Sequence, residues 1–585
     1  MMNMNNNLNI LREKLNKTKI KNWNDISLFL DQIKSEKHNK QVHKNLYKAL
    51  SKGIAFITFD YGIDGVSIEI QKYAQSLELL FKKETCNKVP LHFIGGDFYD
   101  KADTVLSQEW NRFQVPNMNG WSKWSNGKWF SKLFYEDMPE KSEISTQMAQ
   151  EIWNQSVNFV DQLGKYITDN NINLLIPVNI CTNPGNPAIT LAVTILTEAL
   201  GMFVISSNHD YYWEGGKSDR SKDENPGPRD HFFKNHTNTE FFNLFKRLYP
   251  WNGKNWLQVN INEPQSEALI KKFGFPQKNV FELSSCISNK FLNKYKKKEI
   301  ISARERMAYI LSDGSPVIHP TEISNHLENL HDWMKNQKPI VCGNKENQSL
   351  DPTSKGTVYC LQPTRIIGRK RIYKDLKILT ALLNHEKLNN AFKEGKITQL
   401  ILHITGPVPI EHQKDLEKVL YAYKNLCISV DEEIADKVFI AFSVGTENHP
   451  ALKKNGLEKL CIEDIYKLAD IILFPSETEG RGLPIIESSA CGIPIVCSRY
   501  YPEEVFDAVI GRELKKSRRI KYILFPENDN YKAKLLNKIS EILLNREYRK
   551  IYSIHNRKAV KKRFGIKMLV NKFDDFIQIF QNDSI

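Results

Sequence analysis

Short apolar runs alternate with helix-like segments along most of this chain, and this alternation restricts its fold more than any other feature. In the first half, apolar, β-branched and aromatic runs typical of buried strands stand at 53–59, 89–96, 172–180, 202–210 and 279–285. Segments with apolar residues at helical spacing lie between them. Because strands that alternate with helices usually pair in parallel, we expect a Rossmann-like sheet covered by helices.

The same alternation restarts in the second half, after a polar stretch between about 289 and 356 that breaks it. Six short runs typical of strands follow, at 357–366, 399–407, 437–444, 469–476, 493–500 and 521–527. The sequence therefore predicts a second α/β domain of similar architecture.

The length of 585 residues favours two or three domains. We expect five segments: an N-terminal helical extension (1–50), an N-terminal Rossmann-like domain (51–290), a linker with an insertion (291–355), a C-terminal Rossmann-like domain (356–550) and a C-terminal helix that crosses back to the first domain (551–585). Open α/β sheets bind ligands at the carboxyl ends of their strands. We therefore expect two facing domains with a ligand-binding cleft between them.

The net charge of +14 favours acidic partners such as phosphates, anionic lipid surfaces or nucleic acid. Basic runs such as 294–298 and 515–521 are more typical of solvated faces, and no nucleic-acid module with interleaved aromatic and basic residues is present. We expect no nucleic-acid partner, and peripheral contact with an anionic membrane stays open.

The cysteines and the N-terminus bear on location and metal content. Nine cysteines are scattered without a CxxC pair, and no His cluster has metal-ligand spacing. The N-terminus lacks the apolar core of a signal peptide, and no run reaches the roughly 18 apolar residues that a spanning helix needs. We expect a cytoplasmic chain with reduced thiols, peripheral attachment to the inner face of the membrane staying open, and neither a bound metal nor a tightly bound cofactor.

The most informative motif is ADIILFPSETEGRGLPIIESSACGIPIV, at 469–496. A strand-like run is followed by two glycines, which let the backbone approach a ligand closely. A helix that begins near Leu483 would direct its free N–H groups and the positive end of its dipole toward an anion. Glu479 stands in the loop and Glu487 in the helix, eight positions further on.

This block resembles the signature of the retaining glycosyltransferases of family 4, P-S-x-x-E-G-F-G-L-P-x-x-E-A, in which seven residues separate the two Glu. The resemblance implies two facing Rossmann-like domains, the GT-B fold. It also implies that Glu479 contacts the transferred sugar and that Glu487 holds the ribose hydroxyls of a nucleotide.

The same resemblance places four donor-binding residues against the sugar and the diphosphate: Gly480, Arg481, Gly482 and Leu483. Arg481 stands where the family usually has an aromatic residue, and this departure removes neither motif carboxylate.

A second motif, LQPTRIIGRKRI at 361–372, carries Arg365 and Lys370 five positions apart. Fixed cations stabilise the charge that develops on a diphosphate as it leaves. The segment resembles the family's G-R-x-x-x-x-K-G loop, which implies that Arg365 and Lys370 bind the diphosphate. Arg371 replaces the usual glycine after the lysine.

Two features of the first half also resemble the family. His209 follows a predicted strand directly, where the family carries a His that faces the donor sugar. The segment DYGIDGVS resembles the glycine loop near the donor phosphates, with Gly65 at the second glycine and Asp64 at the first.

The resemblance implies a retaining hexosyltransferase. It would use an NDP-sugar as donor and a hydroxyl group of a glycan, lipid or small molecule as acceptor, with His209, Glu479, Arg365 and Lys370 in catalysis. Two alternatives stay open: a GT-B glycoside phosphorylase, and a non-catalytic basic protein that binds nucleic acid or membrane.

Overall fold

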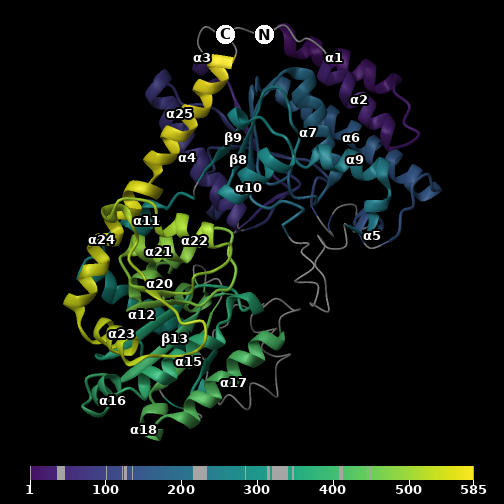
Figure 1. Ribbon diagram of the computed structural model, residues 1–585. Helices are drawn as coiled ribbons and strands as arrows, with labels where there is room; N and C mark the ends of the chain where they lie inside the picture. The colour runs from purple at the N-terminus through teal and green to yellow at the C-terminus, as the bar shows by residue number, and fades with distance from the viewer. Residues whose placement is uncertain are drawn as a thin grey trace. The chain divides into compact units, whose positions relative to one another are not determined.

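The chain forms two compact units in a computed structural model. Unit 1 consists of Met1–Cys286 and Ile566–Ile585, and unit 2 of Ile287–Gly565 (Figure 1). The structure describes residues 2–35, 46–62, 64–100, 102–120, 123, 128–134, 136–214, 233–283, 285–312, 317–318, 340–345, 348, 350–406, 413–443, 446 and 449–583.

Unit 1 is built on a seven-stranded sheet of order β5-β3-β1-β6-β7-β8-β9, in which every pairing is parallel. Its strands are β1 (Ile54–Ile57), β3 (Leu91–Gly95), β5 (Asn111–Gln114), β6 (Leu174–Pro177), β7 (Phe203–Asn208), β8 (Trp256–Asn260) and β9 (Val280–Glu282). Ile54 of the central strand aligns with Leu91 on one side and Leu174 on the other. The expected α/β class is confirmed here, although the sequence pattern did not indicate β5 or β8.

Helices of unit 1 precede the first strand, connect the strands and return at the end of the chain. They are α1 (Met2–Lys17), α2 (Trp23–Ser35), α3 (Leu46–Leu50), α4 (Gly65–Thr85), α5 (Lys128–Phe134), α6 (Glu143–Asp169), α7 (Pro187–Leu200), α9 (Thr239–Leu248), α10 (Glu263–Glu267) and α25 (Ile566–Asp583). Strands β2 (Asp60–Tyr61) and β4 (Asp97–Phe98) form a separate short parallel pair. They follow β1 and β3 in the sequence. Asn186 caps α7, Pro187 occupies its first turn and Gly201 ends it with a φ of 66°.

The first 50 residues belong to the core of unit 1, which differs from the separate extension that we expected. Helices α1 and α2 pack on α6 and α7. Leu11, Trp23 and Phe29 are buried in the same apolar cluster as α7. Apolar side chains at helical spacing need a partner face, and α6 and α7 provide it.

The C-terminal segment also divides differently from the predicted single helix at 551–585. Helix α24 (Arg546–Phe564) packs on α21 (Leu483–Cys491) within unit 2, whereas α25 packs on α4 within unit 1. The ring of Phe573 in α25 lies 5.4 Å from that of Tyr73 in α4. Gly565 marks the division between the two helices.

Unit 2 is built on an eight-stranded sheet of order β10-β11-β14-β13-β12-β15-β16-β17. Its strands are β10 (Val317–Ile318), β11 (Ile340–Cys342), β12 (Thr357–Gln362), β13 (Gln399–Ile404), β14 (Val438–Phe442), β15 (Ile471–Phe474), β16 (Ile495–Cys497) and β17 (Ile523–Leu524). All pairings are parallel except β11 with β14. The six strands expected for this half are all present.

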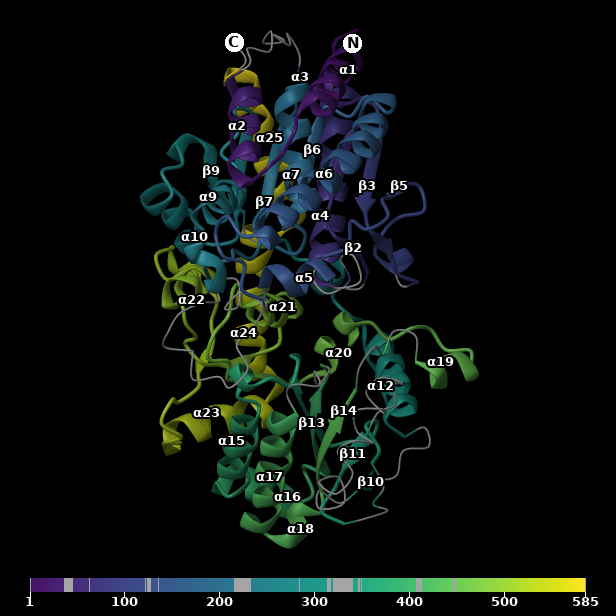
Figure 2. The same ribbon diagram turned by 90° about the vertical axis from the view of Figure 1, so that its right-hand side faces the viewer.

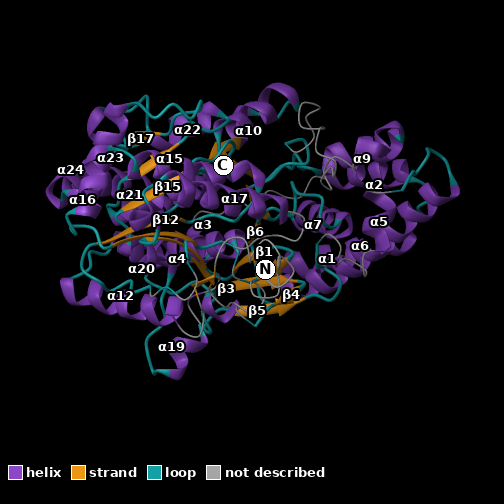
Figure 3. Cartoon of the chain, turned by 90° about the horizontal axis from the view of Figure 1, so that it is seen from below, coloured by secondary structure: helices purple, strands orange, loops and turns teal. Residues whose placement is uncertain are grey.

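Both faces of this second sheet are covered by helices (Figure 3). The helices are α11 (Asn289–Leu292), α12 (Lys297–Ser312), α15 (Tyr373–Leu383), α16 (Glu386–Lys393), α17 (Gln413–Ser429), α18 (Glu432–Ala435), α19 (Pro450–Lys454), α20 (Ile462–Leu468), α21, α22 (Glu503–Ile510), α23 (Ala533–Leu544) and α24. Alternate residues of β12 face opposite layers: Val358 packs with α15 and α17, whereas Tyr359 packs with α12 and α20. This two-sided burial explains the continuously apolar strands of the sequence.

The stretch predicted as a linker contributes structure to unit 2 instead. Helix α12 packs on α19 and α20, and β10 and β11 extend the sheet. The described part of 291–355 thus supplies a helix and two strands at one end of the sheet, with β10 at its edge, rather than an interdomain connection. Residues 313–316 and 319–339 lie outside the described residues.

Across the described ranges, we find no helix whose length and apolar character suit it to cross a membrane.

Candidate active site

The two motifs of the second half meet at the carboxyl edge of the unit 2 sheet. Strands β12 and β15 are parallel neighbours, with Cys360 aligned to Ile471. The loops that follow these two strands therefore begin at the same edge of the sheet. The loop after β12 ends in a short 3₁₀ turn at Gly368–Lys370, and the loop after β15 carries Glu479 before α21 begins.

Lys370 and Glu479 form a buried ion pair between these loops, with both side chains only 9% exposed. The Nζ of Lys370 contacts Oε1 of Glu479 and lies 5.7 Å from the centre of the Phe474 ring. The Arg369 guanidinium lies 3.7 Å from the other Glu479 oxygen. A loop carboxylate thus has two cations against it in a place that water reaches poorly.

Backbone contacts fix the two loops against each other around this ion pair. The Arg369 guanidinium donates to the Thr478 carbonyl at 2.7 Å, and the Glu477 amide donates to the Arg369 carbonyl at 2.8 Å. Arg371, which replaces the family's usual glycine, forms an ion pair with Glu477. Its φ of 49° is left-handed, so the backbone conformation of a glycine is kept at this position.

The pKa of Lys370 is lowered from its usual 10.5. Burial is the largest cause, because it disfavours the ammonium form, and the positive charges of Arg369 and Arg365 act in the same direction. Glu479 opposes them. Two cations thus contact Glu479, and a third, Arg365, acts on Lys370 from an exposed position on the loop.

Gly482 is required by the turn that leads into α21. Its φ is 60°, and a Cβ at this position would lie 2.1 Å from the hydroxyl oxygen of Tyr500. The N-cap of α21 therefore has no side chain to bond its first amides. Gly480 is exposed, while Arg481 and Leu483 are half-buried.

Glu487 lies in α21 and is oriented by a neighbouring helix. The hydroxyl of Tyr466 in α20 donates to Oε2 of Glu487 at 2.7 Å. Burial, and then the negative charge of Glu487, raise the pKa of Tyr466 well above its usual value, so this hydroxyl stays a donor. Tyr466 is a candidate positioning residue that the sequence reasoning missed.

His209 and Gly65 both belong to unit 1. The Nε2 of His209 lies 3.3 Å from the Ser207 hydroxyl, and the His209 carbonyl accepts from the Gln265 carboxamide at 3.0 Å. Gly65 is the first residue of α4, which Asp64 caps, and a Cβ at Gly65 would meet no atom within 4 Å. The fold itself therefore does not require glycine at position 65.

A group of polar residues at the carboxyl edge of the unit 1 sheet was also missed. Asp60 accepts from the Asn119 carboxamide, and burial raises its pKa. Asn179 donates to Asp210 at 3.2 Å and accepts from the Asp210 amide at 2.9 Å. Asp60 directly follows the predicted strand at 53–59, and Asn179 lies near the end of the predicted strand at 172–180. Their position at the carboxyl end of a strand is the sequence signal that could have identified them.

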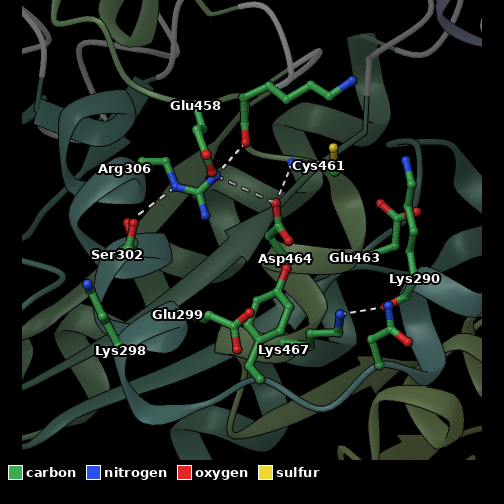
Figure 4. A pocket seen from close by; sticks show the side chains of 13 residues that line it. Lys290, Lys298, Glu299, Ser302, Arg306, Glu458, Cys461, Glu463, Asp464 and Lys467 are labelled. Carbon is green, nitrogen blue, oxygen red and sulfur yellow. Dashed lines mark hydrogen bonds and ion pairs between the residues drawn. The ribbon is translucent and has the colours of Figure 1, made fainter.

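A separate cavity of about 660 Å³ lies between α12 and α20 in unit 2 (Figure 4). Arg306 stands in it, 3.9 Å from Asp464 and bonded to the Lys459 carbonyl. Lysine and glutamate side chains from α11, α12 and α20 line it together, so both charge signs are present. None of the sequence-predicted site residues lines this cavity.

Within the described ranges, no cluster of three or more His, Cys, Asp or Glu side chains could hold a metal ion. The expectation of a metal-independent reaction stays a prediction.

The fold and the motif positions define a two-unit α/β protein with a charged site at the carboxyl edge of its second sheet. Residues 384–559 match the family model of glycosyl transferases group 1. This match includes Glu479 and Glu487 and begins after Lys370. Unit 2 therefore contains a segment that matches the glycosyl transferases group 1, and both units have the expected α/β architecture of a mainly parallel sheet covered by helices.

Two named relatives are similar in sequence. The mannosylglucosylglycerate synthase of Petrotoga mobilis is 23% identical over 457 residues, which cover 75% of this chain and 80% of that protein. The O-antigen chain mannosyltransferase B of Escherichia coli is 48% identical over 46 residues, which cover 8% of this chain and 12% of that protein.

Two solved structures are similar in fold. Anabaena Alr3699/HepE in complex with UDP and glucose has a TM-score of 0.48 at 11% identity, covering 90% of this chain and 99% of that one. WaaG, a glycosyltransferase involved in lipopolysaccharide biosynthesis, has a TM-score of 0.46 at 12% identity, with the same coverage.

We predict that Gly482→Ala destabilises unit 2 more than a glycine substitution that carries backbone strain alone. Gly456 is the matched control, because its φ is 62° and a Cβ there would meet no atom within 4 Å. Gly456→Ala should lose about 1 kcal/mol to left-handed strain, and Gly482→Ala at least about 1 kcal/mol more from the collision with Tyr500. Urea unfolding of both variants measures the difference, and equal losses would contradict the packing described for Gly482.

Proposed function

We propose that this glycosyl transferase moves a hexosyl group from a nucleoside diphosphate sugar to a hydroxyl acceptor with retention of the anomeric configuration. The observation that carries the proposal is the buried ion pair of Lys370 with Glu479. Arg369 flanks this pair, and the positive charge of Arg365 also acts on Lys370. The positive charges of Lys370, Arg369 and Arg365 together exceed the single negative charge of Glu479. The surplus suits a ligand with two phosphoryl groups.

Lys370 and Arg365 stabilise the charge that develops on the leaving diphosphate. Electrostatic groups that are already in place act best where little water is present, because no solvent must reorganise during the reaction. The backbone contacts between the two loops keep Lys370 in place. Glu479, freed in part from Lys370 by the incoming diphosphate, accepts hydrogen bonds from hydroxyls of the transferred sugar.

Helix α21 binds the rest of the donor in this proposal. Its N-terminal amides, which Gly482 leaves without a side-chain cap, are directed at the diphosphate. Glu487 accepts hydrogen bonds from the ribose hydroxyls, in an orientation that Tyr466 helps to fix. Gly480, Arg481 and Leu483 contact the sugar and diphosphate through their backbone.

Unit 1 supplies His209 and Gly65 to the donor in this proposal. His209 orients the sugar, and the open space at Gly65 lets the start of α4 approach the donor phosphates. Because the acceptor would be bound mainly by unit 1, the half-buried Asp60 and the Asn179–Asp210 pair are candidate acceptor contacts.

In the reaction, the bond between the anomeric carbon and the diphosphate oxygen breaks, and a bond from the acceptor oxygen to the same carbon forms on the same face. The proton of the acceptor hydroxyl passes to the leaving diphosphate, so no protein nucleophile is required. Nucleoside diphosphate and the new glycoside are the products.

Two relatives are named for mannosyl compounds or mannosyl transfer, so GDP-mannose is the first donor to test, beside UDP-glucose. Donor hydrolysis, with water as acceptor, makes the test independent of the unknown acceptor. Proton NMR during the first minutes shows whether the released hexose keeps the donor's anomeric configuration. Initial release of the opposite anomer would overturn the assignment of retention.

We predict that Lys370→Ala lowers the rate of nucleoside diphosphate release by about 100-fold or more, because it removes charge stabilisation from the transition state. The matched control is Lys374→Ala, since Lys374 is also a buried lysine and pairs with Asp529 at 3.2 Å. Release should stay within about threefold of wild type in that variant. Phosphorus NMR measures both rates, and an unchanged rate in Lys370→Ala at wild-type fold content would refute the diphosphate role.

The lowered pKa of Lys370 predicts loss of activity on the alkaline side. Lys370 is charged below its pKa, so kcat/KM should be full at neutral pH and should fall as the pH rises through a value below the usual 10.5. Lys370→Arg keeps a positive charge throughout this range, so its alkaline fall should be absent or shifted upward. The same alkaline profile in both proteins would show that another group titrates.

A further inference from the structure

Unit 2 has a second concave surface that the proposed function does not use. Helices α15 and α17 pack side by side (Figure 2). The groove between them has a volume of about 600 Å³, and the chain at Asp529–Tyr531 closes one side of it. None of its lining residues belongs to the proposed donor site.

Tyrosine side chains from three different elements line this groove: Tyr373 of α15, Tyr421 of α17 and Tyr531 of the loop after β17. Tyr421 is 68% exposed, so its largely apolar ring lies open to solvent and takes no part in the core. Tyr531 packs its ring against Phe525, with the centroids 6.4 Å apart, so it is held in place. Aromatic rings held in this way offer flat apolar faces with a polar edge.

The charged groups of the groove lie in ion pairs. Asp529 lies 2.7 Å from the ammonium of Lys377 and 3.2 Å from that of Lys374. Lys418 lies 3.5 Å from Asp415. Three lysines thus face two aspartates, a surplus of one positive charge, but each of these lysines already lies beside a carboxylate.

Uncharged hydrogen-bonding groups complete the lining. Hydroxyls of Thr380 and Ser429 donate to backbone carbonyls of their own helices, at 2.8 and 2.6 Å, and keep lone pairs that can accept. Asn425 lies between Tyr421 and Ser429 in α17, and its exposed carboxamide can both donate and accept.

We propose that this groove binds a neutral oligosaccharide. A sugar ring has apolar C–H faces that pack on aromatic rings, and its edge hydroxyls both donate and accept hydrogen bonds. The exposed ring of Tyr421, the half-buried rings of Tyr373 and Tyr531 and the uncharged polar groups match these properties, and the lysines of the groove already have carboxylate partners. The volume lies within the range of about 300 to 1,000 Å³ of small-molecule sites, which suits a few sugar units. This binding role goes beyond the proposed transfer reaction and would hold a glycan away from the reacting atoms.

The test is binding of the full-length protein to an array of neutral and anionic oligosaccharides, followed by titration calorimetry with the neutral glycan that binds most strongly. We expect a neutral glycan to bind, with an affinity that changes less than twofold when salt rises from about 0.05 to about 0.5 M. Tyr421→Ala should weaken this binding at least tenfold, and Tyr421→Trp should retain it, because an aromatic face remains.

Two control variants separate this groove from other surfaces. Tyr309→Ala removes a tyrosine of α12 that is 43% exposed and lies outside the groove, and it should bind the glycan as wild type does. Lys370→Ala should also bind normally, so failure of the proposed transfer reaction would leave this result intact. Binding of anionic glycans only, equal binding by Tyr421→Ala, or no glycan binding at all would each overturn the proposal.

Discussion

The site depends on one buried ion pair, Lys370 with Glu479, which joins the loops after β12 and β15. Removing a carboxylate and an ammonium from water carries a penalty of several kcal/mol for each ion, and their attraction offsets it only when the geometry is good. Here the parallel pairing of the two strands brings the loops together, and backbone hydrogen bonds between Arg369 and residues 477–478 keep them there. The fold therefore holds the ion pair together, and the ion pair is not what stabilises the fold.

This arrangement also explains why the pair suits a reaction. Burial is the main cause of the lowered pKa of Lys370, and the positive charges of Arg369 and Arg365 lower this pKa further. In the proposed function an incoming diphosphate would add negative charge here, so that ligand binding would compensate for a desolvation penalty that folding has already incurred. In the α15–α17 groove the imbalance is smaller, since Asp529 and Asp415 pair with three lysines. Two surfaces of one unit thus differ in the charge of the ligand that they favour.

The sequence predicts those elements of the fold whose residues carry a local pattern, and it misses those that depend on distant residues. Strands buried on both faces, such as β12 and β15, are continuously apolar, and the sequence predicts all six of the second half. Strand β8 was missed because Gln258 and Asn260 interrupt its apolar run. Those side chains are buried but hydrogen-bonded, Gln258 to the Trp251 carbonyl and both to Asn208, so their partners come from distant residues. The place of α1 and α2 in the core likewise depends on α6 and α7, which local pattern cannot show.

The site divides in the same way. The motif residues Glu479 and Lys370 are recognisable in sequence, but their direct contact, the role of Arg369 and the support of Glu487 by Tyr466 arise only when separate loops and helices meet. Tyr421 carries no motif at all, and its interest comes from its exposure beside tyrosines of two other elements.

Thermal unfolding in the presence of nucleoside diphosphates tests the central claim most directly, because a ligand that binds only the folded state raises the melting temperature. Wild-type protein, Glu487→Ala and the control Glu503→Ala, an exposed carboxylate of α22, would be compared with UDP, GDP and ADP. The account predicts that one nucleotide stabilises wild type and Glu503→Ala and that Glu487→Ala loses most of this shift. No shift with any nucleotide, or an equal shift in Glu487→Ala, would contradict it.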